Sequence, residues 1–152
     1  DIRILGKLDV STIDPVYTIA GVKYATYGHS TVGIKEELAT KVTPSDYDAK
    51  RKLYSYTIDF EKLGKGTDLW LFYQVTDFGE DWNNLVVNLT AGFDGRAFYE
   101  IDSSKRILSI YADKSAPVSV RLIADRYDSS KWPNLRADQE DDYEGHVIPE
   151  KN

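Results

Sequence analysis

Acidic side chains gather where the chain is predicted to turn, and carboxylate oxygens are the ligands that calcium prefers. Packed carboxylates repel one another, and a divalent ion relieves that repulsion. No segment has the acid spacing and central glycine of an EF-hand, so the ligands would come from loops at strand ends. We predict Ca2+ as a cofactor, with an ordinary solvated acidic surface as the alternative. The candidate ligands are Asp77, Glu80, Asp81, Asp125, Asp128, Asp141 and Asp142.

Two tryptophans lie in predicted loops. Trp82 follows an acidic loop and Trp132 precedes a proline, whereas Trp70 belongs to an apolar run and is expected in the core. Exposed tryptophans stack on sugar rings or anchor protein interfaces. We predict that Trp82 and Trp132 are at least partly exposed and take one of these roles. The alternative is a loop tryptophan folded back onto the edge of the domain.

Asn88 begins a tripeptide, Asn88-Leu89-Thr90, that matches the signal for asparagine glycosylation. Modification requires the asparagine to face outward. Alternation along the surrounding strand places Asn88 opposite Leu85, Val87 and Leu89, so an outward Asn88 is expected. Asn88 is therefore the candidate glycosylation site, although short matches of this kind also arise by chance.

The sequence carries no catalytic signature. His29 and His146 are far apart, and no nucleophile elbow, zinc-protease motif or glycine-rich phosphate loop occurs. With no cysteine, thiolate chemistry and disulfides are excluded. A net charge of −6 disfavours nucleic acid as a partner, because phosphate binding requires cations. We predict that the protein is not an enzyme; a carboxylate pair for glycoside hydrolysis is the remaining catalytic alternative.

Strands are the predicted elements that position these groups. Residues 53–60 and 118–124 alternate apolar and polar side chains, which is typical of strands with one buried face. The run 69–75 is apolar on both faces and is predicted as a central strand. Turn-forming residues separate the strands at regular intervals, which favours a sandwich or barrel over alternating strands and helices. The predicted class is all-β with one or two short helices, at 34–41 and 44–52.

The two ends of the chain differ from its middle. We predict one domain over residues 1–152, with 1–12 as a candidate donor strand and 129–152 as an acidic tail. The chain starts without methionine, which we interpret as processing of a secreted precursor or a trimmed start. No apolar run reaches the roughly 20 residues of a membrane span, so no membrane insertion of the mature chain is expected. The candidate donor-strand residues are Ile2, Ile4, Leu5, Leu8 and Val10.

One span resembles a family. "LWLFYQVTDFGEDWNNLVVNLT" and the later "SAPVSVRLIADRY", within residues 69–127, are similar in rhythm to secreted β-sandwich proteins that polymerise. These are the TasA and camelysin group, the archaeal bundling pilins and above all the cannula (CanA-like) proteins of hyperthermophilic archaea. The resemblance implies a jelly-roll-like sandwich, an extracellular or cell-surface location, and calcium-promoted polymerisation in which a strand of one copy completes the sheet of the next.

Three functional hypotheses remain. The first is a structural subunit of an extracellular tube or filament, whose partner is itself in a homopolymer, with a normal N-terminal edge strand as the alternative role for residues 1–12. The second is a secreted, calcium-stabilised carbohydrate-binding module that uses Trp82, Trp132 and surface tyrosines. The third is a hydrolase.

Overall fold

The computed structural model describes residues 4, 8, 10, 13, 16–26, 28, 30–135 and 147–151. The donor-strand candidates Ile2 and Leu5 and the metal candidates Asp141 and Asp142 lie outside the described residues. Contacts group the chain into two compact units, Val32–Pro133 and a second made of Asp1–Thr31 with Asn134–Asn152. The single domain predicted over residues 1–152 stays a prediction.

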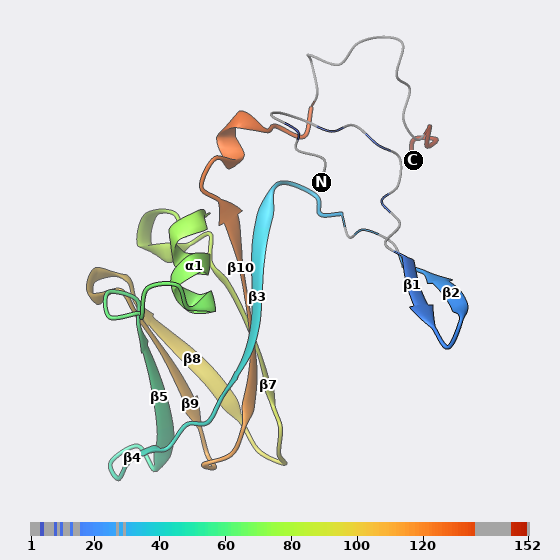
Figure 1. The fold of residues 1–152 in the computed structure, drawn as a ribbon. Helices are drawn as coiled ribbons and strands as arrows, with labels where there is room; N and C mark the ends of the chain where they lie inside the picture. The colour runs from blue at the N-terminus through green and yellow to red at the C-terminus, as the bar shows by residue number, and fades with distance from the viewer. Residues whose placement is uncertain are drawn as a thin grey trace. The chain divides into compact units, whose positions relative to one another are not determined.

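The unit Val32–Pro133 is built from two antiparallel sheets that face each other (Figure 1). In the first sheet, β10 is central: β3 pairs with one of its edges, and β6 and β7 pair with the other. The strands of this sheet are β3 (Lys35–Val42), β6 (Thr76–Asp77), β7 (Val86–Ala91) and β10 (Val118–Arg126).

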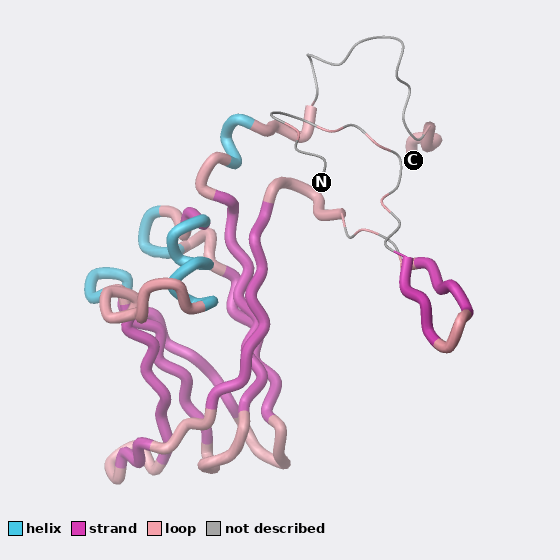
Figure 2. Tube along the Cα trace, in the orientation of Figure 1, coloured by secondary structure: helices cyan, strands magenta, loops and turns pink. Residues whose placement is uncertain are grey.

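The second sheet has the order β4-β5-β9-β8. Its strands are β4 (Asp46–Asp48), β5 (Leu53–Asp59), β8 (Ala97–Asp102) and β9 (Ile107–Ala112). The described residues contain a single α-helix, α1 (Asp68–Val75), and three short 3-10 turns, η1 (Glu80–Trp82), η2 (Ser103–Lys105) and η3 (Ser129–Lys131). The all-β, sandwich-like class predicted from the sequence is confirmed. Figure 2 shows the helical segments of this unit gathered at one end of the sandwich.

The core lies between the central strands of the two sheets. Leu108, Ile110 and Ala112 point inward from β9 and are fully buried. From β10, Val118, Val120, Leu122 and Ala124 point inward and are also buried, as the alternation at 118–124 predicted. Each fully buried aliphatic side chain contributes about 1.5–3 kcal/mol to folding. The core therefore holds the two sheets together through alternating residues of β9 and β10.

The predicted central strand at 69–75 is wrong, because these residues form α1. Thr67 caps the helix: its hydroxyl oxygen accepts a hydrogen bond from the Trp70 backbone N–H at 3.3 Å. Phe72 is buried and Trp70 only half-buried. When every residue of a short run is apolar, the hydrophobic pattern cannot distinguish a buried strand from a buried helix.

The two short helices predicted at 34–41 and 44–52 are also wrong. Residues 35–42 form β3, which pairs along its length with β10, and residues 46–48 form β4, followed by a turn. Intrinsic helix propensity is a weak preference, and the ladder to β10 together with the burial of Val42 outweighs it.

The described residues of the other unit contain a hairpin of β1 (Val16–Ile19) and β2 (Val22–Ala25). Its two turn residues, Ala20 and Gly21, both have positive φ, at 49° and 82°. A two-residue turn in which both residues have positive φ matches the twist of the two antiparallel strands that it joins. Gly21 adopts this backbone conformation without strain. In the predicted tail, Ser129–Lys131 form η3, and residues 147–151 form neither helix nor strand.

Candidate functional site

Two predicted metal ligands meet at the end of the first sheet. Strand β6 pairs with the last residues of β10, which places Asp77 directly opposite Asp125. Like charges in such cross-strand positions repel each other. The Asp125 carboxylate is compensated by Lys35, whose Nζ lies 2.6 Å from Asp125 Oδ1. Asp77 Oδ1 accepts a hydrogen bond from the Gly79 N–H at 2.8 Å.

Glu80 and Asp81 follow in η1, beside the turn η2 of the other sheet. The Asp81 backbone is left-handed, with φ 49°. Its Oδ1 accepts a hydrogen bond from Ser103 Oγ at 3.3 Å, which ties η1 to η2. The acidic loop is therefore fixed to both sheets at this end of the sandwich.

The carboxylate of Asp128 is engaged within the chain. Arg126 donates from Nε at 2.5 Å, and the Trp132 indole N–H donates at 3.1 Å. The hydrogen bond from Arg126 has the largest effect and lowers the pKa of Asp128. The hydrogen bond from Trp132 lowers this pKa further. Among the described residues, no group of three or more His, Asp or Glu side chains is placed to hold a metal ion. The calcium site stays a prediction.

Asp102 in the adjoining β8–η2 turn has the most strongly shifted pKa among these acids. Hydrogen bonds from Ser104 Oγ and from the Lys105 ammonium hold the pKa of Asp102 at about 2, against an ordinary value of 3.8. The lowered pKa means that the ionised form is the one that stabilises the turn. This stabilisation is complete above the ordinary pKa and is lost as pH falls through about 2.

We expect Asp102→Asn to weaken the dependence of the melting temperature on pH in this acid range. The wild-type melting temperature should fall more steeply than that of the variant as pH decreases from 3.8 towards about 2. Ser104→Ala removes the hydrogen bond that lowers the pKa of Asp102 most. The melting temperature of this variant should therefore depend on pH with an intermediate slope. Thermal melts followed by circular dichroism at matched ionic strength measure all three, and identical slopes would contradict the assignment.

The predicted exposure of Trp82 is wrong. Its side chain is only 8% exposed and packs edge-on against Phe60 and Phe78, with ring centroids 5.2 and 5.0 Å away. The acidic residues next to Trp82 in the sequence suggested a position at the surface. In the structure, Trp82 belongs to an aromatic cluster that closes this end of the sandwich. Trp132 is 40% exposed, as expected, so it alone of the two can meet a sugar or a partner.

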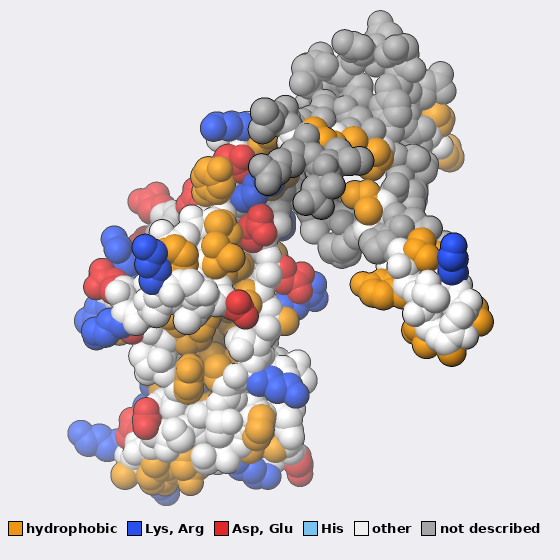
Figure 3. All heavy atoms as spheres, viewed as in Figure 1, with side chains coloured by type: hydrophobic (Ala, Val, Ile, Leu, Met, Phe, Trp, Pro, Cys, Tyr) orange, Lys and Arg blue, Asp and Glu red, His pale blue; other side chains and the backbone are white. Residues whose placement is uncertain are grey.

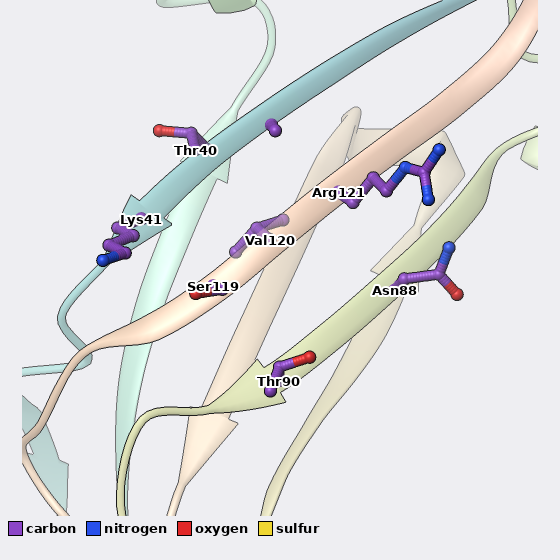
Figure 4. A pocket seen from close by; sticks show the side chains of 8 residues that line it. Thr40, Lys41, Asn88, Thr90, Ser119, Val120 and Arg121 are labelled. Atoms are coloured by element: carbon purple, nitrogen blue, oxygen red, sulfur yellow. The ribbon is translucent and has the colours of Figure 1, made fainter.

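The prediction that Asn88 faces outward is confirmed. Asn88 is exposed on β7, while Leu85 and Val87 are buried. It lies opposite Arg121 of β10, and Thr90 lies opposite Ser119. These side chains line a shallow concavity of about 700 Å3 on the outer surface of the first sheet. Figure 4 shows that the lining residues come from three neighbouring strands: Ala39, Thr40, Lys41, Asn88, Thr90, Ser119, Val120 and Arg121.

The sequence also missed a hollow of about 210 Å3 between β3 and α1. It could not be anticipated while 69–75 was predicted as a strand, although the Thr67-Asp68 pair is a recognisable helix start. Four of its lining residues are apolar and three are acidic. The lining residues are Glu36, Glu37, Leu38, Asp68, Leu71, Phe72 and Val75.

The described donor-strand candidates carry exposed apolar side chains. Ile4, Leu8 and Val10 are 51%, 57% and 44% exposed and belong to no strand. The hairpin β1–β2 also exposes large apolar side chains from both strands, and an isolated two-stranded hairpin is only marginally stable in water. The exposed hairpin residues are Val16, Tyr17, Ile19, Val22 and Tyr24.

Within the described part of the chain, no helix has the length and apolar character needed to cross a membrane. No family model, curated protein or solved structure matches this chain.

Proposed function

We propose that this chain is a structural subunit that assembles with copies of itself into an extracellular tube or filament by donor-strand exchange. The observation that carries the proposal is the exposure of Ile4, Leu8 and Val10, which stand at even positions of a β-prone segment. Even spacing puts their side chains on one face of an extended strand. A strand with one apolar face is stable only where that face is covered, and the sheet of a second copy can cover it.

Burial of the exposed aliphatic side chains favours assembly. Covering a large aliphatic side chain contributes about 1.5–3 kcal/mol. Donation of a strand from one copy to the next is a head-to-tail contact, and a contact of this type repeats without closing unless its rotation forms a ring. The resemblance of residues 69–127 to the cannula and TasA–camelysin proteins supports the same function and an extracellular location.

Calcium promotes the assembly in this proposal. Asp77, with Glu80 and Asp81 following in the same loop, gathers negative charge at one end of the sandwich, while Asp125 opposite Asp77 is already paired with Lys35. A divalent ion between two copies removes repulsion there and adds carboxylate coordination. Asp128 contributes less to binding because Arg126 and Trp132 already engage it.

Replacing Asp77, Glu80 and Asp81 together with Asn, Gln and Asn should weaken calcium binding by about tenfold or more, because affinity depends on ligand charge. Isothermal titration calorimetry with CaCl2 measures the change. The matched control is Asp46→Asn with Asp94→Asn, which removes exposed acids from other places in the sandwich. Equal affinity of the triple variant and the wild type would exclude this loop as a calcium site.

The direct test of the function is light scattering of the purified chain, titrated with CaCl2 and then with chelator. Growth to large particles that electron microscopy shows as regular tubes or fibres supports the proposal. A particle that stays monomeric at every calcium concentration contradicts it.

A carbohydrate-binding module is the second candidate, favoured by the concavity around Asn88. Its hydroxyl, amide and ammonium groups, from Thr90, Ser119 and Lys41, are the donors and acceptors that sugars use. Trp132 does not line this concavity but offers a separate ring that is 40% exposed. This module stays monomeric in calcium and loses affinity in a glycan screen on Lys41→Ala or Trp132→Ala.

A further inference from the structure

Strand β8 forms one edge of the second sheet. Within the described residues it pairs with β9 along its whole length, Ala97–Asp102, and with no other strand. At the other edge of this sheet, β4 is only three residues long, and Figure 3 shows hydrophobic side chains at the surface between β3 and β5, below α1. The register of β8 with β9 is continuous and β8 contains no proline, so this longer edge is a template for another strand.

The hydrogen bonds to β9 determine which backbone groups of β8 face outward. Just before the strand begins, the Asp113 N–H donates to the Arg96 carbonyl at 3.2 Å. Opposite residues of an antiparallel ladder alternate between pairs that exchange hydrogen bonds and pairs that do not. Arg96 belongs to a bonded pair, so the even-numbered residues of β8 bond to β9. The N–H and C=O groups of Ala97, Tyr99 and Ile101 therefore point away from β9, towards the open edge.

The side chains of the same three residues form the inner row of β8. Ala97, Tyr99 and Ile101 lie opposite the buried residues of β9 and share their face of the sheet. Tyr99 is nevertheless 40% exposed, because in the described part of the chain no strand lies beyond it. A strand added at this edge would cover the ring.

The outer row of β8 carries charges of both signs. Arg96, at its start, is exposed and places its guanidinium over the Phe98 ring, 5.3 Å from the centroid. Glu100 is neutralised by Arg51, whose Nη1 and Nη2 lie 3.2 and 2.7 Å from its two carboxylate oxygens. Asp102 ends the row, with 39% of its side chain exposed. The row therefore runs from a cation to an acid.

Such a row is complementary to itself when two copies pair in antiparallel orientation. With Tyr99 opposite Tyr99 of a second copy, Arg96 lies opposite Asp102, and Ala97 lies opposite Ile101. Opposite charges and large side chains in such cross-strand positions attract each other. Every outward-facing N–H group of one copy then meets an outward-facing carbonyl of the other.

Neighbouring registers fit less well. Centring the pair on Glu100 sets this acid opposite its own copy and moves Arg96 past the end of the strand, so like charges meet and opposite charges separate. Centring the pair on Phe98 sets Ile101 opposite Gly95, which lies outside β8. The charges and the backbone groups therefore favour the register centred on Tyr99.

We propose that β8 pairs with β8 of a second copy around a two-fold axis at Tyr99, which joins the two second sheets into one continuous sheet. The contact is isologous, so it closes as a dimer. It goes beyond the proposed strand exchange, because it requires neither calcium nor residues 1–12. Where both contacts form, pairing of β8 joins two filaments side by side.

Disulfide cross-linking tests the register, because the wild-type chain contains no cysteine. Full-length Tyr99→Cys should form covalent dimers in chelator under mild oxidation, since residues paired on the axis have Cα atoms about 5.5 Å apart, within disulfide range. Ala97→Cys is the matched control, because in this register its own copy lies about 13 Å away. The Tyr99→Cys dimer, measured by mass spectrometry, should form at least about tenfold faster than the Ala97→Cys dimer.

A mixture of Ala97→Cys and Ile101→Cys completes this test, because the proposed register sets these two positions opposite each other. The mixed dimer should form about as fast as the Tyr99→Cys dimer. Equal rates for Tyr99→Cys and Ala97→Cys alone would overturn the register.

Tyr99→Pro tests the backbone pairing while β8 stays bound to β9. Proline has no N–H, but the Tyr99 N–H points to the open edge, so the ladder to β9 loses no hydrogen bond. The dissociation constant of the dimer should rise at least about tenfold relative to Tyr99→Thr, which removes the same ring and keeps the N–H. Sedimentation velocity in chelator measures both variants, with circular dichroism to show that they are folded. Equal dissociation constants, or a wild type that is monomeric at every concentration, would overturn the proposal.

Light scattering in CaCl2 separates this dimer from the proposed function. Growth in calcium without selective cross-linking of Tyr99→Cys overturns the β8 pairing and leaves strand exchange standing. A cross-linked dimer in chelator with no growth in calcium supports the β8 pairing and overturns the proposed function. Selective cross-linking together with growth supports both.

Discussion

Trp82→Ala is expected to lower the free energy of unfolding by about 3–5 kcal/mol, the usual cost of removing a buried tryptophan. The Trp82 ring makes edge-on contacts with Phe60 and Phe78, and such aromatic pairs contribute about 0.5–1.5 kcal/mol beyond burial. No neighbouring group can refill the space without moving the cluster. Urea unfolding followed by circular dichroism measures the loss.

Trp132→Ala is the matched control. This tryptophan is 40% exposed and keeps one hydrogen bond, to Asp128, so its removal should cost less than about 1 kcal/mol. Equal losses for the two variants would show that Trp82 has no special place in the packing. Loss of sugar binding or assembly in Trp82→Ala would be attributed to unfolding and not to a surface role.

The proposed strand exchange predicts that Ile4→Asp with Leu8→Asp abolishes calcium-dependent assembly at concentrations where the proposed polymer of the wild type forms. Covering two aliphatic side chains contributes about 1.5–3 kcal/mol each, and about 1.4 kcal/mol changes an equilibrium tenfold. The critical concentration for assembly should therefore rise by at least about 100-fold. Sedimentation of the polymer over a dilution series measures it.

The matched control is Val147→Asp with Ile148→Asp. These residues are also aliphatic and exposed near the other end of the chain, but the proposal gives them no role. The control should assemble like the wild type. If both double variants lose assembly equally, the effect is one of added charge; if neither does, residues 4 and 8 do not belong to a donated strand.

The sequence predicted best where a strand has one buried face and one wet face. The alternation at 118–124 identified the inward residues of β10, and the alternation around Asn88 identified its outward position. Strict alternation of apolar and polar residues is typical of a strand with one buried face, so it also tells which side chains point inward. It failed at α1, where Leu69, Phe72 and Tyr73 meet the core and no polar face marks the period.

Other failures came from contacts between residues distant in the chain. The two glycines of residues 90–96 favour a hairpin turn in the sequence, but this segment crosses between the sheets, because β7 and β8 belong to different sheets. The burial of Trp82 depends on Phe60, which lies in another part of the chain. The pairing of Asp77 with Asp125 depends on the ladder between β6 and β10. Local pattern contains no information about such partners.

The central place of β10 also sets the order in which this molecule can mature. Strands β3, β6 and β7 each take their register from β10, which is the last strand in the described part of the chain. Until residue 126 is available, β3 lacks β10, the strand with which it pairs, and closing so long a loop is slow. The first sheet therefore cannot form before residue 126 has been synthesised, so chain synthesis sets the earliest time at which this unit can fold.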